Sequence, residues 1–230
     1  MINQRNNFIN LSRIRQEFKH VISEDEMKNI ESLVRMYQRY QAGANEIGTK
    51  LSNLDDDFRL TYDYAPIHSI EARMKSPESL MGKINRKKLP INVESIQNNI
   101  FDVAGIRVVT SYIDDAYSVA DLLKQQSDIT VIKEKDYIKN PKNNGYRSLH
   151  VIFSVPVFQT DGVYDIPVEV QFRTIGMDFW ASLEHELVYK NNLDPKVKKQ
   201  YQADLEVYAE ELSNMDTKMR EIFKDLYPQN

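Results

Sequence analysis

The sequence of 230 residues contains no cysteine, one tryptophan and only seven glycines. Without cysteine the chain can form no disulfide, no thiol nucleophile and no thiolate metal site, which fits a reducing compartment. It also has no Gly-rich phosphate loop, no apolar run as long as a membrane span, and no apolar centre of a signal peptide in its first residues. We therefore expect a cytoplasmic protein without a membrane segment.

A strong charge of one sign is missing as well. The chain has 30 basic and 34 acidic residues, a formal net charge of −4. No overall field attracts DNA or an anionic membrane, so neither is expected as a partner, and any polyanion must be held by a local group of cations. The length suits one substantial core. We expect a single domain over 1–230, with N-terminal helices over 1–57, a core over 58–190 and a C-terminal helix over 191–230.

Two helical patterns precede the core. A short one covers residues 9–21, and a longer one begins at Ser23, which three acidic residues follow, as is common in a first helical turn. The apolar residues of the longer pattern recur at steps of three and four: Ile30, Leu33, Tyr37, Tyr40, Ala44, Ile47, Leu51 and Leu54. This spacing favours a core-facing helical hairpin over a sheet rather than a free coiled coil.

The centre of the chain predicts an α+β fold. Strand patterns lie within 58–75 and over 104–110, 129–132, 149–155 and 165–172, and helical patterns over 76–87, 93–98, 113–126 and from Thr174 onward. The last two strands are joined by a turn at 159–162. We therefore predict a mixed, mainly antiparallel sheet of about five strands, flanked by helices.

Cations gather where the first strand meets a helix. Arg73 and Lys75 share one strand face, and Ser76-Pro77-Glu78 has the order of an N-cap, a first helical position and an early acidic residue. With Ser79 and Lys83 one turn further on, the junction offers cations, a hydroxyl and free backbone N–H groups to a polyphosphate. A capped surface helix with scattered lysines would have the same sequence.

The segment Tyr137–His150 joins two apolar runs and contains turn-forming residues at 141–145. It also offers cations, a flat ring and an imidazole: Lys139, Lys142, Arg147, Tyr146 and His150. Over 133–147 there are five cations and two carboxylates, a local basic patch in an acidic protein. Such a loop can hold a nucleotide, although an exposed hairpin kept soluble by its lysines is the alternative.

Two strands carry polar groups that require an explanation. Arg107 interrupts the apolar run 104–110, so it either lies on an open sheet face or meets a negative or flat group. In 165–173, Glu169, Gln171 and Arg173 alternate with apolar residues and should share one face. That face is either a functional row or the solvated side of an antiparallel sheet.

The C-terminal part is read as helical and largely structural. His185 lies in the helix capped by Thr174 and has no suitably spaced metal partner, so we interpret it as structural. Apolar residues then follow a heptad-like seam: Tyr201, Leu205, Tyr208, Leu212, Met215, Met219 and Ile222. Packing against the helix over 23–54 and packing against another subunit would both produce this seam.

Four segments in the same order resemble motifs of the RelA/SpoT-type synthetases, which make the alarmones ppGpp and pppGpp. They are Glu71–Leu80, Asp102–Val109, Tyr137–His150 and Pro167–His185. The chain is most similar to the small alarmone synthetases of this family, often called RelP and RelQ. The resemblance implies a nucleotidyltransferase-like fold and transfer of pyrophosphate from ATP to the ribose 3′-hydroxyl of GDP or GTP, with release of AMP.

The resemblance also implies roles for individual residues. Asp102 and Glu169 would hold Mg²⁺, and Glu169 would accept the hydroxyl proton. The ATP side would use Arg73 and Arg107 around adenine, with Lys75, Ser79 and Lys83 on the phosphates. The GDP or GTP side would use Tyr146 beneath guanine, its neighbours Asn144, His150 and Gln171, and the phosphate-binding cations Lys135, Lys139, Lys142 and Arg147. One condition follows from strand parity: Asp102 must precede the strand of Arg107, or follow a bulge, if both serve one site.

Further expectations come from the same resemblance. Small members form homotetramers through their helical ends, and too few residues flank the motifs for a hydrolase domain, so synthesis without hydrolysis is expected. Lys133 stands where arginine is usual, which leaves the choice of GDP or GTP open. Single-stranded RNA is a further partner that the loop cations allow, although no RNA-specific stacking motif is present.

Two other functions use similar scaffolds. A nucleotide or RNA sensor without catalysis would have replaced Asp102 or Glu169, and both are present. A nucleotidyltransferase that attacks the α-phosphorus would usually carry a close Asp-x-Asp pair, which we do not find at a strand end.

Overall fold

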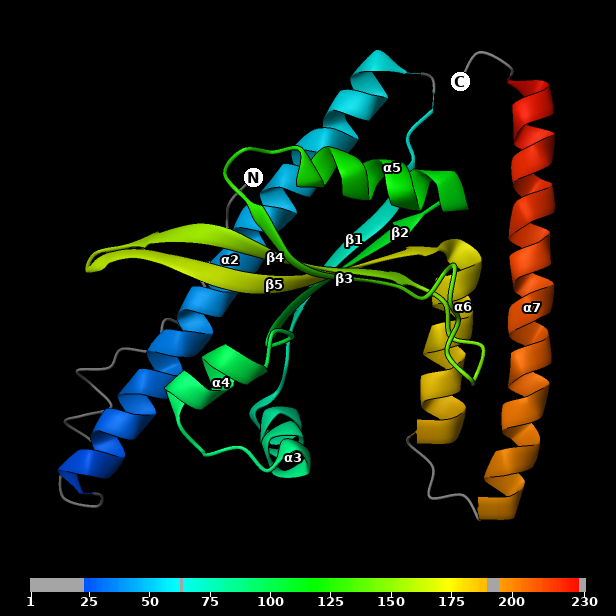
Figure 1. Cartoon of the computed structure of the whole chain (residues 1–230). Coiled ribbons are helices and arrows are strands. Elements are labelled where there is room, and N and C mark those ends of the chain that lie inside the picture. The colour runs from blue at the N-terminus through cyan, green and yellow to red at the C-terminus, as the bar shows by residue number, and fades with distance from the viewer. Residues whose placement is uncertain (1–22, 63, 190–194, 228–230) are drawn as a thin grey trace.

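The computed structural model describes residues 23–62, 64–189 and 195–227 (Figure 1). The short helical pattern over 9–21 lies outside the described residues. The elements are α2 (Glu24–Thr61), β1 (Ile67–Met74), α3 (Pro77–Lys87), α4 (Val93–Asn99), β2 (Ala104–Thr110), α5 (Ile113–Lys124), β3 (Thr130–Asp136), β4 (Leu149–Gln159), β5 (Gly162–Thr174), α6 (Ile175–Glu184), the π-helix η1 (His185–Tyr189) and α7 (Pro195–Leu226).

The strands form one five-stranded sheet in the order β1-β2-β5-β4-β3. Strands β2 and β5 run parallel, and the other neighbouring pairs are antiparallel. The prediction of a mixed, mainly antiparallel sheet is therefore confirmed. Strand β3 continues to Asp136, past its predicted end at Ile132. It is an edge strand, where charged side chains stay in water, so its lysines and acids do not end the pairing.

Helix starts follow the predicted capping chemistry. Ser23 and Glu26 form a reciprocal capping box at the start of α2, in which the Ser23 hydroxyl accepts from the Glu26 N–H. At the start of α3, the Ser76 hydroxyl accepts from the Ser79 N–H, and Pro77 occupies the first helical position. Each side chain satisfies a backbone donor that a helix start would leave free, which is typically worth about 1 kcal/mol.

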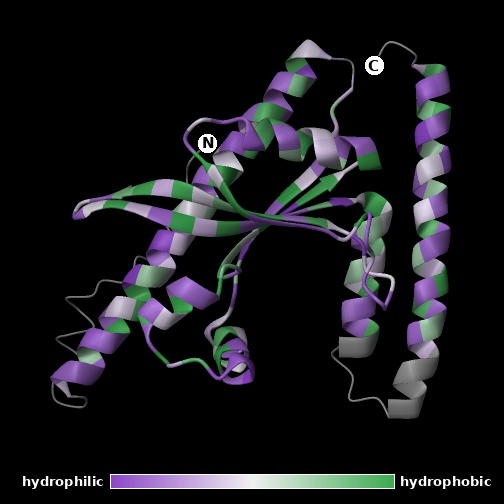
Figure 2. Ribbon diagram, in the orientation of Figure 1, coloured by the Kyte–Doolittle hydropathy of each residue, from purple (hydrophilic) through white to green (hydrophobic). Residues whose placement is uncertain are grey.

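One face of the sheet is the core. Helix α2 lies across β1, β2, β4 and β5, and α5 packs on β2, β4 and β5 of the same sheet. In Figure 1, α5 lies on one side of the sheet, whereas α3, α4 and α6 lie on the other. Val168, Val170 and Phe172 of β5 are fully buried, and burying each contributes roughly 1.5–3 kcal/mol. Along the strands, Figure 2 shows apolar residues alternating with polar ones, which therefore face the opposite side.

The predicted helical seam of α2 is the part that meets the sheet. Tyr40, Ala44, Ile47 and Leu51 are all buried. Gly43 lies in the same buried stripe, close to Ile166 of β5. The predicted core-facing position over the sheet is therefore confirmed, but the pattern forms one continuous helix, Glu24–Thr61, and not a hairpin.

The C-terminal helix packs on α6 rather than on α2. The Trp180 indole N–H donates to the Leu205 carbonyl at 2.8 Å, and Ala209 is buried. The seam residues Tyr201, Tyr208, Met215, Met219 and Ile222 are each at least 50% exposed. Of the two partners that the sequence left open for the seam, α2 is therefore excluded within the part of the chain that the structure describes.

Across the described ranges, no helix combines the length and the apolar character that a bilayer crossing requires.

We predict that alanine has opposite effects at two glycines of α2. A Cβ atom at Gly43 would lie 2.8 Å from Ile166 Cγ2, whereas a Cβ at Gly48 would meet nothing within 4 Å. Both substitutions gain about 1 kcal/mol of helix propensity, but only Gly43→Ala adds an overpacking cost of about 1–3 kcal/mol. Urea unfolding should therefore show Gly48→Ala more stable than wild type and Gly43→Ala less stable than Gly48→Ala. Equal stability of the two variants would contradict the close packing of α2 on β5.

Candidate functional site

Residues from all five strands align in two rows on the open face of the sheet. The first row is Arg73, Gly105, Glu169, Ile152 and Lys133, and the second is Glu71, Arg107, Gln171, His150 and Lys135. Side chains in register on neighbouring strands lie close together. The pairing therefore assembles cations, carboxylates, an amide and an imidazole on one surface.

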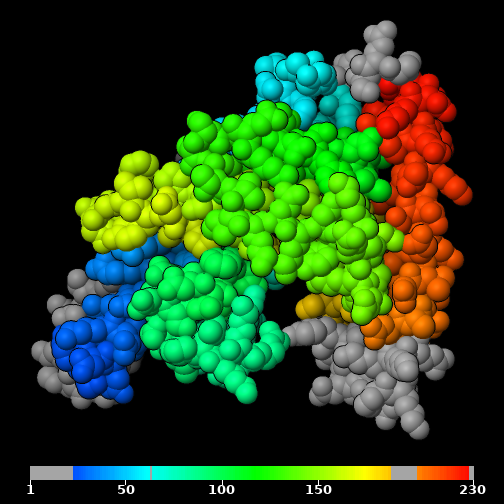
Figure 3. Space-filling model, in the orientation of Figure 1, coloured from blue at the N-terminus to red at the C-terminus, as the bar shows by residue number. Residues whose placement is uncertain are grey.

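This surface is the floor of a cleft of about 810 Å³. Its walls come from α3 and α4 on one side, with Lys83, Lys87 and Asn99, and from α6 on the other. In Figure 3 a notch separates these two lobes below the sheet. The predicted site residues that line the cleft are Arg73, Lys83, Asp102, Arg107, Lys135, Lys142, Asn144, Tyr146, His150, Glu169 and Gln171.

Asp102 precedes β2, which begins at Ala104. This position satisfies the parity condition that the sequence imposed. Its carboxylate pairs with Lys75 Nζ at 3.0 Å and with Lys83 Nζ at 2.7 Å. Burial alone would raise the pKa of Asp102, but Lys83 and Lys75 outweigh burial and hold it below its ordinary value. The group is therefore an anion at neutral pH.

Glu169 lies on β5 beside His150 and Gln171. The Gln171 side-chain amide donates to Glu169 Oε2 at 2.7 Å, and His150 Nδ1 lies 3.5 Å from Oε1. Burial would raise the pKa of Glu169, but the hydrogen bonds from these two neighbours leave it lowered. Burial also lowers the pKa of His150, so its imidazole is neutral near pH 7. A neutral donor thus supports a charged carboxylate.

Asp102 and Glu169 are the candidate metal ligands. Both line the cleft, and the charge of Asp102 raises the pKa of Glu169, so the two carboxylates lie within electrostatic reach of each other. No group of three or more His, Asp or Glu among the described residues could hold a metal ion. Mg²⁺ typically takes one or two carboxylates and completes its shell with phosphate oxygens and water. The donor set therefore fits an ion that arrives with a phosphate ligand.

Four predicted site residues do not line the cleft. Lys75 is next to it, through its ion pair with Asp102. Ser79 is exposed and accepts from the Ser76 hydroxyl at 2.9 Å. Lys139 is exposed and lies 4.9 Å from the centre of the Tyr117 ring.

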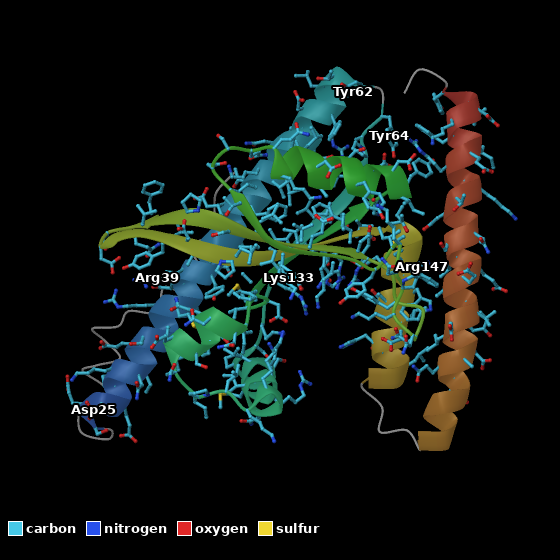
Figure 4. All side chains as sticks on the ribbon, viewed as in Figure 1. Asp25, Arg39, Tyr62, Tyr64, Lys133 and Arg147 are labelled. Atoms are coloured by element: carbon cyan, nitrogen blue, oxygen red, sulfur yellow. The ribbon has the colours of Figure 1, made fainter. Side chains whose placement is uncertain are left out.

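Arg147 is the fourth, and it contacts α7 instead of the cleft. Its guanidinium pairs with Glu210 of α7 and donates to the Ile138 carbonyl at 3.3 Å. Figure 4 shows Arg147 on the side of the loop next to α7. Gly145 touches the same helix: its φ is +85°, and a Cβ there would lie 2.7 Å from the Ala209 Cβ. In this structure Arg147 therefore attaches the loop to α7, and phosphate binding by Arg147 stays a prediction.

Sequence reasoning missed several residues of the cleft. Arg173 was predicted to share the β5 face of Glu169 but was given no role, and it lines the cleft. His185 lies at the start of η1, is exposed and lines the cleft, so the interpretation of a structural histidine missed its position. Lys133 and Tyr137 also line the cleft. Lys133 belonged to the local basic patch and to a family motif, whereas Tyr137 had no signal beyond its place at the start of the loop.

Comparison with known proteins was made for both sequence and fold. The family described as "Region found in RelA / SpoT proteins" matches residues 72–194. The chain is 42% identical to the GTP pyrophosphokinase YwaC of Bacillus subtilis over 187 residues, which cover 81% of this chain and 88% of that protein. The crystal structure of the Bacillus subtilis small alarmone synthetase 1 bound to its product pppGpp superposes with a TM-score of 0.76 at 32% identity, covering 86% of this chain and 98% of that one. The AMPCPP-bound structure of the same synthetase gives a TM-score of 0.70 at 29% identity, covering 85% and 98%.

We predict that the pKa of His150 lies below the ordinary value of about 6.5 and falls further in Glu169→Gln. Burial is the larger cause of the lowered pKa, and the Glu169 carboxylate partly opposes it by favouring the imidazolium. Removing that negative charge therefore removes the interaction that raises the pKa of His150. A pH titration of the ring resonances by NMR, assigned with His150→Asn, measures both values. A higher pKa in Glu169→Gln than in wild type would contradict the contact between the two residues.

Proposed function

Because this chain belongs to the RelA/SpoT family and resembles its small alarmone synthetases over most of its length, we propose that it transfers pyrophosphate from ATP to the ribose 3′-hydroxyl of GDP or GTP and releases AMP. The observation that carries the proposal is the pair Asp102 and Glu169 on one cleft, with arginines toward one edge strand and an aromatic loop toward the other.

The β1 side of the cleft suits ATP. Arg73 and Arg107 stand on adjacent strands, and a planar guanidinium can stack on a purine or pair with phosphate. Gly105 pairs with Arg73 across β1 and β2, in the same row as Glu169. Lys83 and Lys75 are near Asp102 at the same end, where Ser79 also opens α3, so these three are assigned to the ATP phosphates.

The loop side of the cleft suits the guanine nucleotide. Tyr146 offers a ring for the base, with Asn144, His150 and Gln171 as its polar neighbours. Lys142 Nζ lies 4.4 Å from the centre of that ring and 4.7 Å from that of Tyr137. Lys135 and Lys142 line the cleft, and we assign them, together with the exposed Lys139 of the same loop, to the phosphates of the acceptor.

The reaction needs a base, charge stabilisation and alignment. The acceptor 3′-oxygen attacks the β-phosphorus of ATP, the bond from that phosphorus to the oxygen of the α-phosphate breaks, and AMP leaves. Glu169 is ionised because its pKa is lowered, and we assign this carboxylate to accept the hydroxyl proton. We assign Mg²⁺ to Asp102 and Glu169, where it would neutralise the triphosphate and align it. The cations of both sides balance the charge that develops on the phosphates.

We predict that the purified protein, with Mg²⁺, γ-labelled ATP and GDP or GTP, yields labelled ppGpp or pppGpp together with AMP. Chelation with EDTA should stop the reaction, and readdition of Mg²⁺ should restore it. Glu169→Gln should lower kcat about 100-fold or more, because the base is lost. Chromatography of the labelled products measures all three effects.

The matched control is Asp161→Asn, the same change of charge in the turn between β4 and β5, where Asp161 pairs with Arg39. It should retain wild-type activity. In the same assay, Tyr146→Ala should raise KM for the guanine nucleotide more than KM for ATP. Label appearing only as free phosphate, or near-normal turnover by Glu169→Gln, would refute the proposed reaction.

We also propose that the chain assembles into a homotetramer through its helical ends, as the resemblance to small synthetases implies. The support is the exposed seam of α7, where apolar residues recur along the outer surface (Figure 2). Isolated monomers rarely expose a continuous apolar patch of this kind.

We predict that Met215→Glu and Tyr208→Glu each shift the sedimentation coefficient from that of a tetramer to that of smaller species. Burying a new charge at an apolar interface costs several kcal/mol. The control is Phe158→Glu, which places the same charge at a residue of β4 that is 78% exposed and outside α7. A wild-type protein that sediments as a monomer, or α7 variants that sediment like wild type, would rule out assembly through this surface.

A further inference from the structure

Arg173 is a buried cation in the cleft with no role assigned so far. Only 6% of its surface is exposed. Its NH2 donates both to the Tyr146 hydroxyl and to Gln171 Oε1, each at 2.8 Å, and its NH1 donates to Asp178 Oδ1 at 3.0 Å. A guanidinium can only donate hydrogen bonds, so each of these three partners must accept.

This donation fixes the orientation of Gln171. Because Gln171 Oε1 accepts from Arg173, the other end of the amide is Nε2, which donates to Glu169 Oε2 at 2.7 Å. If the amide were flipped, its NH₂ group would face the N–H donors of Arg173, and its oxygen would face the carboxylate oxygens of Glu169. Neither contact could then be a hydrogen bond. One oxygen of the Glu169 carboxylate is thereby connected to Arg173.

The same donation fixes the proton of His150. Because the Tyr146 oxygen accepts from Arg173, its hydrogen is free to donate to His150 Nε2, 2.8 Å away. In the neutral imidazole, Nε2 is then the acceptor and the proton lies on Nδ1. This proton lies on the ring atom nearest the second carboxylate oxygen, since Nδ1 is 3.5 Å from Glu169 Oε1.

The contacts therefore close a ring through Arg173, Tyr146, His150, Glu169 and Gln171. We propose that Arg173 is a positioning residue, which sets the tautomer of His150 and the rotamer of Gln171 so that both donate to the Glu169 carboxylate. The proposal rests on the proposed function, in which Glu169 is the base. Without the guanidinium, only the carboxylate itself would orient the amide and the imidazole, and the tyrosine hydroxyl could turn away from His150, so the carboxylate would be less firmly aligned.

Asp178 holds Arg173 in place. It lies in the first turn of α6, and the same oxygen that accepts from Arg173 lies 3.2 Å from Arg107 Nε. Arg107 also pairs with Glu71 on β1. The Asp178 carboxylate therefore connects Arg107, on the ATP side, to Arg173 and its closed set of contacts on the acceptor side.

The test uses Arg173→Gln, Tyr146→Phe and the double variant. Tyr146→Phe keeps the aromatic ring and removes only the hydroxyl. Each single change should lower kcat by about 10–100-fold, the usual effect of removing a group that orients a ligand of the reacting centre, with little change in either KM. Because both act through one ring of contacts, the double variant should be no slower than Arg173→Gln alone. The control is Arg59→Gln, which removes an exposed arginine of α2 and should leave kcat unchanged.

A kcat that falls multiplicatively in the double variant would overturn the proposal. So would an Arg173→Gln variant whose only defect is a raised KM, because Arg173 would then bind a nucleotide directly. Tyr146→Phe buries no new charge and keeps the test decisive if Arg173→Gln fails to fold.

The tautomer provides a readout that does not depend on activity. The ¹⁵N shifts of His150 in the wild-type protein at pH 7 should show a protonated Nδ1 and an unprotonated Nε2, and Tyr146→Phe should show a mixture of both tautomers. A protonated Nε2 in the wild type would overturn the proposal even if the synthetase reaction is confirmed. Conversely, absence of ppGpp synthesis with the expected tautomer would refute the proposed function alone.

Discussion

The parallel pairing of β2 with β5 is the constraint on which the cleft depends. It places Gly105 beside Glu169 and Arg107 beside Gln171, and it brings the segment before β2, which holds Asp102, to the same end of the sheet. Every other neighbouring pair is antiparallel and extends these rows to the edge strands. A shift of one residue in this single pairing would turn one set of polar groups into the core.

Asp102 and Glu169, the two half-buried carboxylates of the cleft, stay ionised for different reasons. Asp102 is balanced by two ammonium groups, whereas Glu169 is held by the His150 imidazole and the Gln171 amide. A cation that binds a phosphate can leave Asp102 when substrate arrives. The imidazole and the amide keep Glu169 in its ionised form, which is the form that can accept a proton in the proposed reaction.

The helix starts at Ser23 and Ser76 and the polar face of β5 around Glu169 could be predicted from the sequence, because each depends only on residues a few positions apart. Parity limited Asp102 to a position before its strand or after a bulge, provided that it shares a site with Arg107. The alignment of Arg107 with Gln171 could not be predicted, because register between distant strands is set by tertiary packing. The direction of Arg147 was also beyond reach, since it depends on Glu210 of α7, a helix whose partner the periodicity left open. Arg173 was visible as a member of a strand face, but its three acceptors lie on three different segments.

Because Gly145 contacts α7, the loop tolerates sequence change on the side that faces the cleft but not on the side that faces the helix. The residue at this position has a left-handed backbone and only hydrogen-sized clearance to Ala209, whereas its neighbour Tyr146 faces an open cleft. Variation that retunes the choice of nucleotide can therefore accumulate on the cleft side of the loop, while the surface against the helix admits neither bulk nor an extra residue.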